Sequence, residues 1–326
     1  MHALPLRGAR RIGPHSGPYR GFTLIELLIA ISIIGILAAA AVFAMFAAQE
    51  SARETKTRST IAKLHGLMMD RWESYRTRRL PIDLPPQPSK ADEARLRGIR
   101  ELLRLEMPDR WTDITDPPAV LQMVPPSLWQ AYALRVQAVK NEKGAGFPTP
   151  QFQGAECLYL IVTMGPADEV GGIEQFRASE IGDTDGDGMP EFLDGWGRPI
   201  SFLRWAPGFT RWPATLPPTA DSVVLSDLQS GDPNKDPDPL DPRRLVRTAY
   251  ALYPLVFSAG PDGRYGLWNG NRGEQQFHYA QYQNNPYYAD SSNGGQQIGS
   301  PVDETTDQPG GTDYVDNLHN HLLLVQ

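Results

Sequence analysis

The chain has 326 residues, and its 31 Lys and Arg against 38 Asp and Glu give a formal net charge of −7. This acidic composition argues against nucleic-acid binding, which requires a basic patch. Cys157 is the single cysteine of the sequence, so an intrachain disulfide is excluded. The 30 glycines and 30 prolines predict long irregular connections between the regular elements.

The N-terminal segment combines a basic leader with a long apolar run. Four arginines and no acid precede the run: Arg7, Arg10, Arg11 and Arg20. No residue between Leu27 and Ala48 is charged, and a helix of about 20 apolar residues is long enough to cross a bilayer. The basic leader predicts that the N-terminus stays in the cytoplasm and that the remainder of the chain faces outward.

One acidic residue, Glu26, lies near the start of the apolar run. An ionisable group within a membrane-spanning segment costs about 2.5–3.5 kcal/mol on insertion scales, so a segment that only anchors gains nothing from it. A plain single-pass anchor is nevertheless one alternative. A secretory signal peptide cleaved near residues 38–41 is another, although its apolar core of about 7–15 residues would be shorter than this run.

Residues 21–28, with the sequence GFTLIELL, resemble the class III signal of type IV pilins and pseudopilins. The resemblance implies that a prepilin peptidase cleaves between Gly21 and Phe22 and methylates the new N-terminal residue. It also implies that Glu26 neutralises the N-terminal amine of a neighbouring subunit in a helical filament. The alternative is that Glu26 pairs only with the amine of its own chain.

No proline interrupts the chain between Phe22 and Leu80. Apolar residues recur at three- and four-residue spacings in the second half of this stretch. The pattern predicts one continuous helix, apolar on all sides in residues 22–49 and amphipathic in residues 50–80. Residues 81–155 are predicted to form a Pro-rich linker and a helical insert, with helices at 91–106 and 127–143.

Residues 156–326 are predicted to form a β-rich periplasmic domain with long loops at 206–242 and 269–311. The strand patterns span 157–163, 199–205 and 251–257. Loops separate them, so an antiparallel sheet is expected. Cys157 is expected in the core. The predicted fold class is α+β and pilin-like, with a long N-terminal helix packed on a small antiparallel sheet.

Residues 183–194 have the spacing of a calcium-binding loop. Side chains that bear oxygen occupy positions 1, 3, 5, 9 and 12 of this loop: Asp183, Asp185, Asp187, Glu191 and Asp194. Gly188 at position 6 permits the sharp turn of an EF-hand loop. Position 12 is Asp in place of Glu, position 8 is Pro190, and no helix flanks the loop. It resembles the helix-free loops of thrombospondin type 3 and dockerin-like repeats, and a solvated acidic turn is the alternative.

Three further segments resemble the major pseudopilin of type II secretion: 194–200 (DGWGRPI), 257–263 (FSAGPDG) and 311–313 (GTD). The resemblance implies a second calcium site with Asp262 and Asp313 as ligands and the carbonyls of 258–260 as weaker candidates. The sequence departs from that family by a long insert at 267–310. A simple Pro-Asp-Gly turn after a strand is the alternative interpretation of the middle segment.

Enzymatic activity is not predicted, because the chain has no G-x-S-x-G, H-E-x-x-H or phosphate-loop motif. His319 and His321 are expected in a surface tail. The resemblance implies a pseudopilin of the bacterial inner membrane that assembles into a periplasmic pseudopilus. The implied partners are copies of itself, minor pseudopilins, a prepilin peptidase, the secretion assembly platform and the inner membrane. The alternatives are a type IV pilin for adhesion or DNA uptake and a membrane-tethered calcium-dependent binding module.

Overall fold

The computed structural model describes most of the chain. The described residues are 21–80, 82–118, 124–165, 172–211, 225–272, 275–276, 285–289, 295–306 and 308–325. The chain divides into two compact units, Met1–Glu50 and Ser51–Gln326. Residues 1–20 of the predicted leader, and parts of the loops predicted at 206–242 and 269–311, lie outside the described residues.

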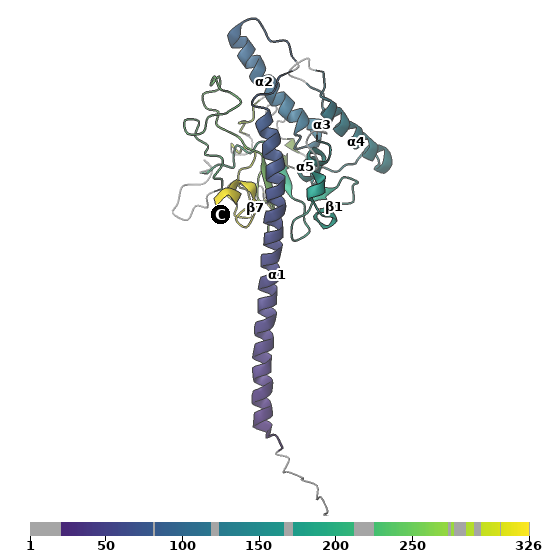
Figure 1. The fold of residues 1–326 in the computed structure, drawn as a ribbon, viewed down its shortest axis with the longest axis vertical. Helices are drawn as coiled ribbons and strands as arrows, with labels where there is room; N and C mark the ends of the chain where they lie inside the picture. The colour runs from purple at the N-terminus through teal and green to yellow at the C-terminus, as the bar shows by residue number, and fades with distance from the viewer. Residues whose placement is uncertain are drawn as a thin grey trace, which may run out of the picture. The chain divides into compact units, whose positions relative to one another are not determined.

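Helix α1, which spans Leu24–Ser74, is the longest element of the described chain (Figure 1). The other α-helices are α2 (Pro88–Glu106), α3 (Trp111–Thr115), α4 (Ser127–Lys143) and α5 (Gln153–Thr163). The 3-10 helices are η1 (Ile173–Gln175), η2 (Ala178–Glu180) and η4 (Asn320–Val325). The strands are β1 (Ile181–Gly182), β2 (Glu191–Phe192), β3 (Ser201–Leu203), β4 (Leu255–Ser258), β5 (Asn271–Arg272), β6 (Gln275–Gln276) and β7 (Leu318–His319).

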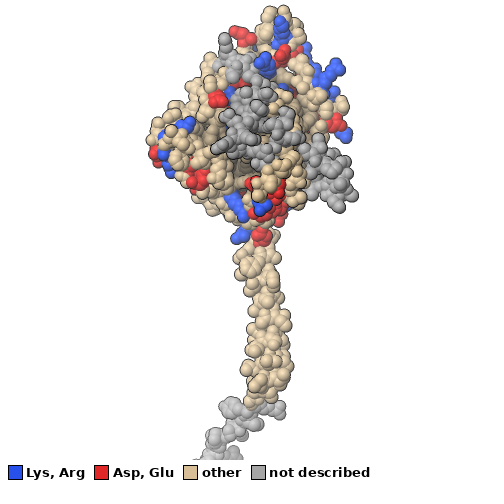
Figure 2. Space-filling view, turned by 180° about the vertical axis from the view of Figure 1, so that it is seen from behind, with Lys and Arg blue, Asp and Glu red and all other residues tan. Residues whose placement is uncertain are grey.

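The first unit contains the apolar half of α1, which carries no charged side chain between Leu27 and Ala48 (Figure 2). Its large apolar side chains are exposed, from Phe22 at 83% to Phe46 at 60%. A helix that is apolar on all sides belongs in a protein core or in a membrane. By length and composition this helix is able to cross a membrane, and its apolar segment is not buried in the structure. The prediction of a long helix with an apolar first half is confirmed.

Helix α1 ends at Ser74, slightly before the predicted end at Leu80. The N–H of Tyr75 donates to the carbonyl of Trp72 at 3.2 Å, the tighter bonding pattern that is frequent in a last helical turn. The Tyr75 side chain is fully buried, and its hydroxyl donates to Oε2 of Glu106 at 2.7 Å. Tyr75, the first residue after α1, is thus held in the core by a hydrogen bond to the end of α2.

The second half of α1 supplies one face of the hydrophobic core of the second unit. Ile61, Leu64, Met68 and Trp72 recur at three- and four-residue spacings and are at most 3% exposed. The ring of Trp72 lies 4.9 Å from that of Tyr253. This part of the helix is therefore amphipathic, as predicted.

Polar contacts also join this half of α1 to distant segments. Nη1 of Arg71 donates to the carbonyl of Ile161 in α5 at 3.0 Å. Nδ2 of Asn320, directly after β7, lies 3.0 Å from Nδ1 of His65. Figure 1 shows α5 and β7 beside this part of α1.

The main sheet has the strand order β3-β4-β7 and is antiparallel throughout. Phe202 pairs with Val256, and Phe257 pairs with His319. Helix α5 packs on β2 and β3. The approach is close, because a Cβ atom at Gly154 would lie 2.8 Å from the carbonyl oxygen of Phe202. The α+β, pilin-like arrangement of a long helix with small antiparallel sheets is as predicted.

The predicted strand at 157–163 is wrong, because these residues belong to helix α5. The segment is buried on nearly every side, including Cys157 and Leu158 at 0% exposure. A short apolar run that is buried all round has no periodicity that separates a strand from a helix. Cys157 does lie in the core, as expected.

Helices α2 and α4 form the predicted insert and contact each other. The bounds of α4 match the predicted range 127–143. Helix α2 begins before the predicted residue 91, and Pro88 lies in its first turn. A proline is tolerated there because the N–H that it lacks would have no partner within the helix.

The expectation of a C-terminal surface tail is wrong. Leu318–His319 forms β7 at the edge of β4, and η4 follows directly. His321 is fully buried, with Nδ1 2.8 Å from Oγ of Ser226. The polar residues of this tract are held by contacts that the local sequence does not reveal: Nδ2 of Asn317 donates to the carbonyl of Tyr265 at 2.6 Å, and Nδ2 of Asn320 donates to that of Pro254 at 2.9 Å.

Candidate functional site

The predicted cleavage point lies directly before α1. Gly21, Phe22 and Thr23 have no regular secondary structure, and α1 begins at Leu24. The carbonyl of Thr23 accepts the N–H of Leu27 at 3.1 Å, so Thr23 is the N-cap residue. The structure therefore places Gly21 and Phe22 in an exposed, non-helical segment next to the helix.

Glu26 forms a capping box with Thr23. Oε2 of Glu26 accepts the backbone N–H and the hydroxyl of Thr23, both at 2.9 Å. The Thr23 hydroxyl oxygen in turn accepts the N–H of Glu26 at 3.2 Å. Such a reciprocal pair satisfies two helix N–H groups that would otherwise have no partner. Within one chain, Glu26 therefore has a helix-capping role besides any role between chains.

The loop between β1 and β2 gathers three of the predicted calcium ligands. Carboxylate oxygens of Asp183, Asp185 and Asp187 lie within 4.8 Å of one another. Both oxygens of Asp183 accept backbone N–H groups, from Asp187 at 3.1 Å and from Gly188 at 3.0 Å. The loop backbone thus holds these carboxylates at close range despite their mutual repulsion.

Glu191, the fourth predicted ligand, stands at the start of β2 and is completely buried. It joins a second group, in which oxygens of Glu156, Asp185 and Glu191 lie within 4.8 Å of one another. Burial raises the pKa of Glu191 to about 7. Asp185 belongs to both groups, so the two form one acidic cluster.

Glu156 belongs to α5 and was not among the predicted ligands. It is completely buried, and neither of its oxygens has a hydrogen-bond donor among the described residues. Burial raises the pKa of Glu156 to about 10, and the neighbouring carboxylate of Asp187 adds to the rise. A sequence signal did exist, since Glu156 is the one acid within the apolar segment that forms α5.

Asp194, the predicted ligand at position 12, belongs to a different network. Its Oδ1 accepts the backbone N–H of Trp196 at 2.8 Å and of Arg198 at 2.9 Å. Its Oδ2 accepts the hydroxyl of Ser258 at 2.7 Å. Asp194 thus closes the turn after β2 and ties it to β4, and the structure does not bring it into the acidic cluster.

The second predicted site brings Asp262 and Asp313 to the same corner of the unit. Oδ1 of Asp262 accepts the N–H of Arg264 at 2.8 Å, and Nη1 of Arg264 lies 3.5 Å from Oδ1 of Asp313. Nη1 of Arg198 donates to the carbonyl of Gly260 at 2.7 Å. Arginine side chains therefore contact two of the implied ligands, the carbonyl of Gly260 and the carboxylate of Asp313. Neither aspartate belongs to a three-acid group among the described residues.

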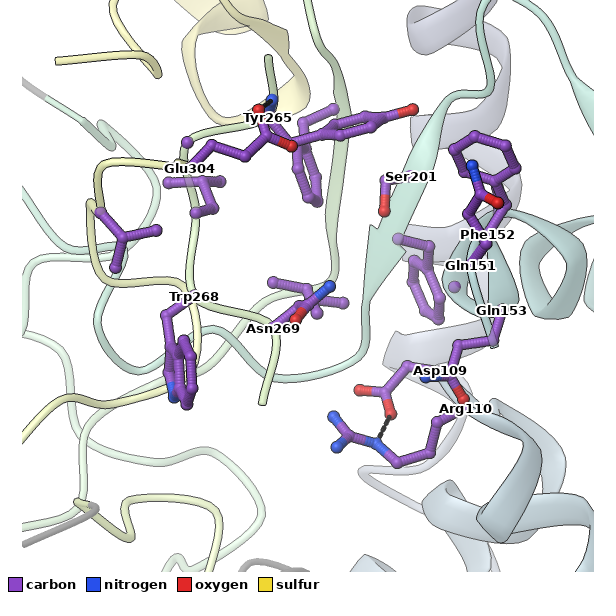
Figure 3. Close-up of a pocket in the computed structure, with 18 residues that line it drawn as sticks. Asp109, Arg110, Gln151, Phe152, Gln153, Ser201, Tyr265, Trp268, Asn269 and Glu304 are labelled. Carbon is purple, nitrogen blue, oxygen red and sulfur yellow. Dashed lines mark hydrogen bonds and ion pairs between the residues drawn. The ribbon is translucent and has the colours of Figure 1, made fainter. Parts of the chain in front are cut away.

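A cavity of about 290 Å³ opens between the α5 side of the unit and the segment after β4. Figure 3 shows Asp109 and Arg110 on one wall and Trp268, Asn269 and Glu304 on the other. Nε of Arg110 donates to Oδ1 of Asp109 at 2.8 Å. The cavity is at the small end of the range for ligand pockets, and its charged pair is already satisfied.

Comparison with known proteins gives one match. Residues 18–42 match the family model described as the prokaryotic N-terminal methylation motif. This motif indicates a type IV pilin-like precursor. The matched range includes Gly21, Phe22, Glu26 and much of the apolar half of α1. No curated protein and no solved structure matches the chain.

The motif indicates that a prepilin peptidase processes the chain and that the chain takes part in a pilus-like assembly. It therefore points to a structural subunit. The exposed apolar half of α1 agrees with this, since that segment is suited to a membrane or to packing against other helices. Sequence reasoning missed the capping partner Thr23, although Thr23-Leu24-Ile25-Glu26 has the spacing of a capping box.

Proposed function

We propose that this chain is a pseudopilin, a subunit of a periplasmic filament in a type II secretion-like system of the bacterial inner membrane. In this proposal the prepilin peptidase removes residues 1–21, and the mature chain waits in the membrane with α1 as its span. The secretion assembly platform and minor pseudopilins then add it to a filament of its own copies.

One observation carries the assembly step of this proposal: Glu26 is the one acid at the start of the exposed apolar half of α1, which has no other charge up to Ala48. Cleavage before Phe22 creates a charged amine close to this carboxylate. Two charges in a medium of low dielectric constant are each costly alone and much less so when paired. Pairing Glu26 of an incoming subunit with the amine of its neighbour would fix the axial register of the filament.

The capping box permits a test that separates charge from helix capping. Gln can replace Glu in a capping box, so Glu26→Gln keeps the cap and removes the charge. Thr23→Val removes the capping hydroxyl and keeps the carboxylate, at a cost of about 1 kcal/mol to the helix end. We expect Glu26→Gln to be inserted and processed but not assembled, and Thr23→Val to assemble.

The measurement is filament yield in cells that contain the peptidase and the assembly components, with membrane insertion as a control. Assembly of Glu26→Gln at the wild-type yield would contradict the role between subunits. Loss of assembly in Thr23→Val alone, with normal assembly of Glu26→Gln, would mean that Glu26 acts only as a helix cap.

The assignment to type II secretion, as against a type IV pilin, is supported by the three segments that resemble the major pseudopilin. The single cysteine also fits, because the chain has no C-terminal cysteine pair. Immunogold labelling of cells that overproduce the chain distinguishes the two. The proposal predicts label in the cell envelope and loss of protein secretion on deletion, whereas surface fibres with normal secretion would favour a pilin.

The same assignment implies calcium at the corner of Asp262 and Asp313. Its support is that the fold brings Asp313 close to the turn that contains Asp262, since the side chain of Arg264, two residues after Asp262, reaches Asp313. In this proposal calcium raises the thermal midpoint of the protein and Asp262→Asn reduces the gain. An Asp262→Asn variant with the full wild-type gain would contradict calcium at this corner.

A further inference from the structure

Glu156 presents a problem that the filament role does not explain. It is a carboxylic acid with no exposed surface, held on α5 against the sheet, and neither oxygen has a hydrogen-bond donor among the described residues. A buried charge without a partner costs several kcal/mol, so such groups are paired, protonated or bound to a metal. The surroundings of Glu156 decide among these possibilities.

The groups that surround Glu156 are themselves acidic. Its carboxylate faces Asp185 and Glu191, with oxygens of all three within 4.8 Å of one another. Asp183 and Asp187 extend the cluster through Asp185. A proton on Glu156 would satisfy that residue and one neighbour, but it would leave the other acids close together and negative. A divalent cation would neutralise several of them at once.

The basic residues nearby contact the backbone of the loop and not its carboxylates. Nζ of Lys143 donates to the carbonyl of Gly186 at 3.0 Å, and Nη2 of Arg135 donates to that of Gly188 at 3.1 Å. Both residues belong to α4, and their side chains bind the loop through its backbone carbonyls. The described ion pairs therefore leave the charge of the cluster uncompensated.

The ligand atoms of the cluster and their spacing favour calcium over other metal ions. All the side-chain ligands are carboxylate oxygens, with no histidine or cysteine, which suits a hard cation and disfavours zinc or copper. The 1, 3, 5 spacing of Asp183, Asp185 and Asp187 belongs to calcium loops, and calcium accepts six to eight oxygens in flexible geometry. Magnesium demands a near-ideal octahedron and retains several waters.

We propose that Glu156 and the 183–191 loop bind one calcium ion, with the carboxylate of Glu156 supplied from α5 in place of the ligand at position 12. The sequence offers Asp194 for that position, but hydrogen bonds from Trp196, Arg198 and Ser258 hold it elsewhere. The ion would join the β1–β2 hairpin to the helix that packs on β3. It would stabilise the unit by mass action in a compartment that contains calcium.

The site shares no residue with the corner of Asp262 and Asp313. The two are therefore separable by mutation. Glu156→Gln and Asp185→Asn each remove one ligand charge from the proposed site with little change in volume. Asp262→Asn is the matched control, since it makes the same kind of change outside the site.

The experiment is isothermal titration of CaCl₂ into the metal-free full-length chain in detergent micelles, with MgCl₂ as a second titrant. We expect Glu156→Gln and Asp185→Asn to lose one calcium site or to bind it about tenfold more weakly, since ligand charge tunes the affinity of calcium loops. Asp262→Asn should retain that site. Magnesium should bind more weakly than calcium.

Thermal unfolding of the same samples guards against misfolded variants. Without calcium, Glu156→Gln should unfold close to the wild-type midpoint, because the amide has nearly the same volume as the acid and carries no charge into the interior. When calcium is added, Glu156→Gln should lose the part of the rise in the thermal midpoint that comes from this site. Asp262→Asn should keep that part. Calcium binding by Glu156→Gln with wild-type affinity and stoichiometry would overturn the proposal, as would the absence of any calcium binding to the wild type.

Discussion

Nη1 of Arg204, directly after β3, lies 2.7 Å from Oδ2 of Asp113 in α3, and neither side chain is exposed. The same nitrogen donates to the carbonyl of Met107 at 3.0 Å and lies 3.8 Å from Oδ1 of Asp109. A buried network of opposite charges therefore joins the main sheet to the chain between α2 and α3. The chain has no disulfide with which to make such a connection.

Removing one partner of this network should be strongly destabilising. Asp113→Ala leaves Arg204 buried without its closest carboxylate, and breaking a buried pair in this way costs about 3–5 kcal/mol. The control is Asp92→Ala, because Asp92 pairs with Arg243, which is largely exposed. That pair should contribute at most about 1 kcal/mol. Urea unfolding of the full-length variants in detergent measures both, and similar losses in the two would contradict the account.

Acid should destabilise the second unit through His321. Its Nδ1 lies 2.8 Å from the Ser226 hydroxyl and its Nε2 lies 3.3 Å from the Pro254 carbonyl, contacts that suit a neutral ring protonated on Nε2. Burial lowers the pKa of His321 to about 3, so the unfolded chain binds this proton first as the pH falls below about 6.5. Stability is therefore present above that pH and is lost progressively down to about pH 3.

The expected size of this loss is about 1.4 kcal/mol between pH 7.5 and pH 5.5 for this one histidine. His321→Gln cannot gain the proton, so its unfolding free energy should depend less steeply on pH, although the variant is less stable at neutral pH. Urea unfolding at several pH values provides the comparison. Parallel pH profiles for the two proteins would rule out His321 as the source.

Two glycines should respond to alanine in opposite directions. A Cβ at Gly195 would clash with the carbonyl oxygen of Arg53 in α1. The backbone N–H of Gly195 donates to Oγ1 of Thr57 at 2.8 Å. Gly195→Ala should push this turn away from the helix and destabilise the unit by about 1–3 kcal/mol. Gly66, in the interior of α1, has nothing within 4 Å of a Cβ.

Gly66→Ala should therefore stabilise the helix by up to about 1 kcal/mol, because alanine has the higher helix propensity. Thermal midpoints of both variants, measured in the same detergent, test the pair. A stable Gly195→Ala protein would show that the turn does not need its close contact with α1.

The local patterns of the sequence were sufficient for α1, α4, β3 and β4. Each carries its own period or propensity, and the absence of proline allows α1 to continue past its apolar half. Helix α5 could not be predicted in the same way, because burial on nearly every side removes the polar positions that reveal a helical period. β7 has only two residues and depends on its pairing with β4.

The residues of the candidate sites also differ in whether local sequence or the tertiary fold brings them together. The spacing of Asp183, Asp185 and Asp187 is local, so the sequence predicts that they meet. Glu156 reaches them only because α5 packs against β2, which depends on the tertiary fold. The loop spacing alone would place Asp194 in the acidic cluster. Hydrogen bonds from the backbone of its own turn and from the Ser258 hydroxyl hold it outside the cluster instead.

The mass of the mature N-terminal peptide decides whether the chain is processed after Gly21. The full-length chain is expressed with a prepilin peptidase, purified from membranes and analysed by mass spectrometry. We expect a chain that begins at Phe22 and carries one added methyl group. A chain that retains residues 1–21, or one that begins after the apolar half of α1, would contradict it.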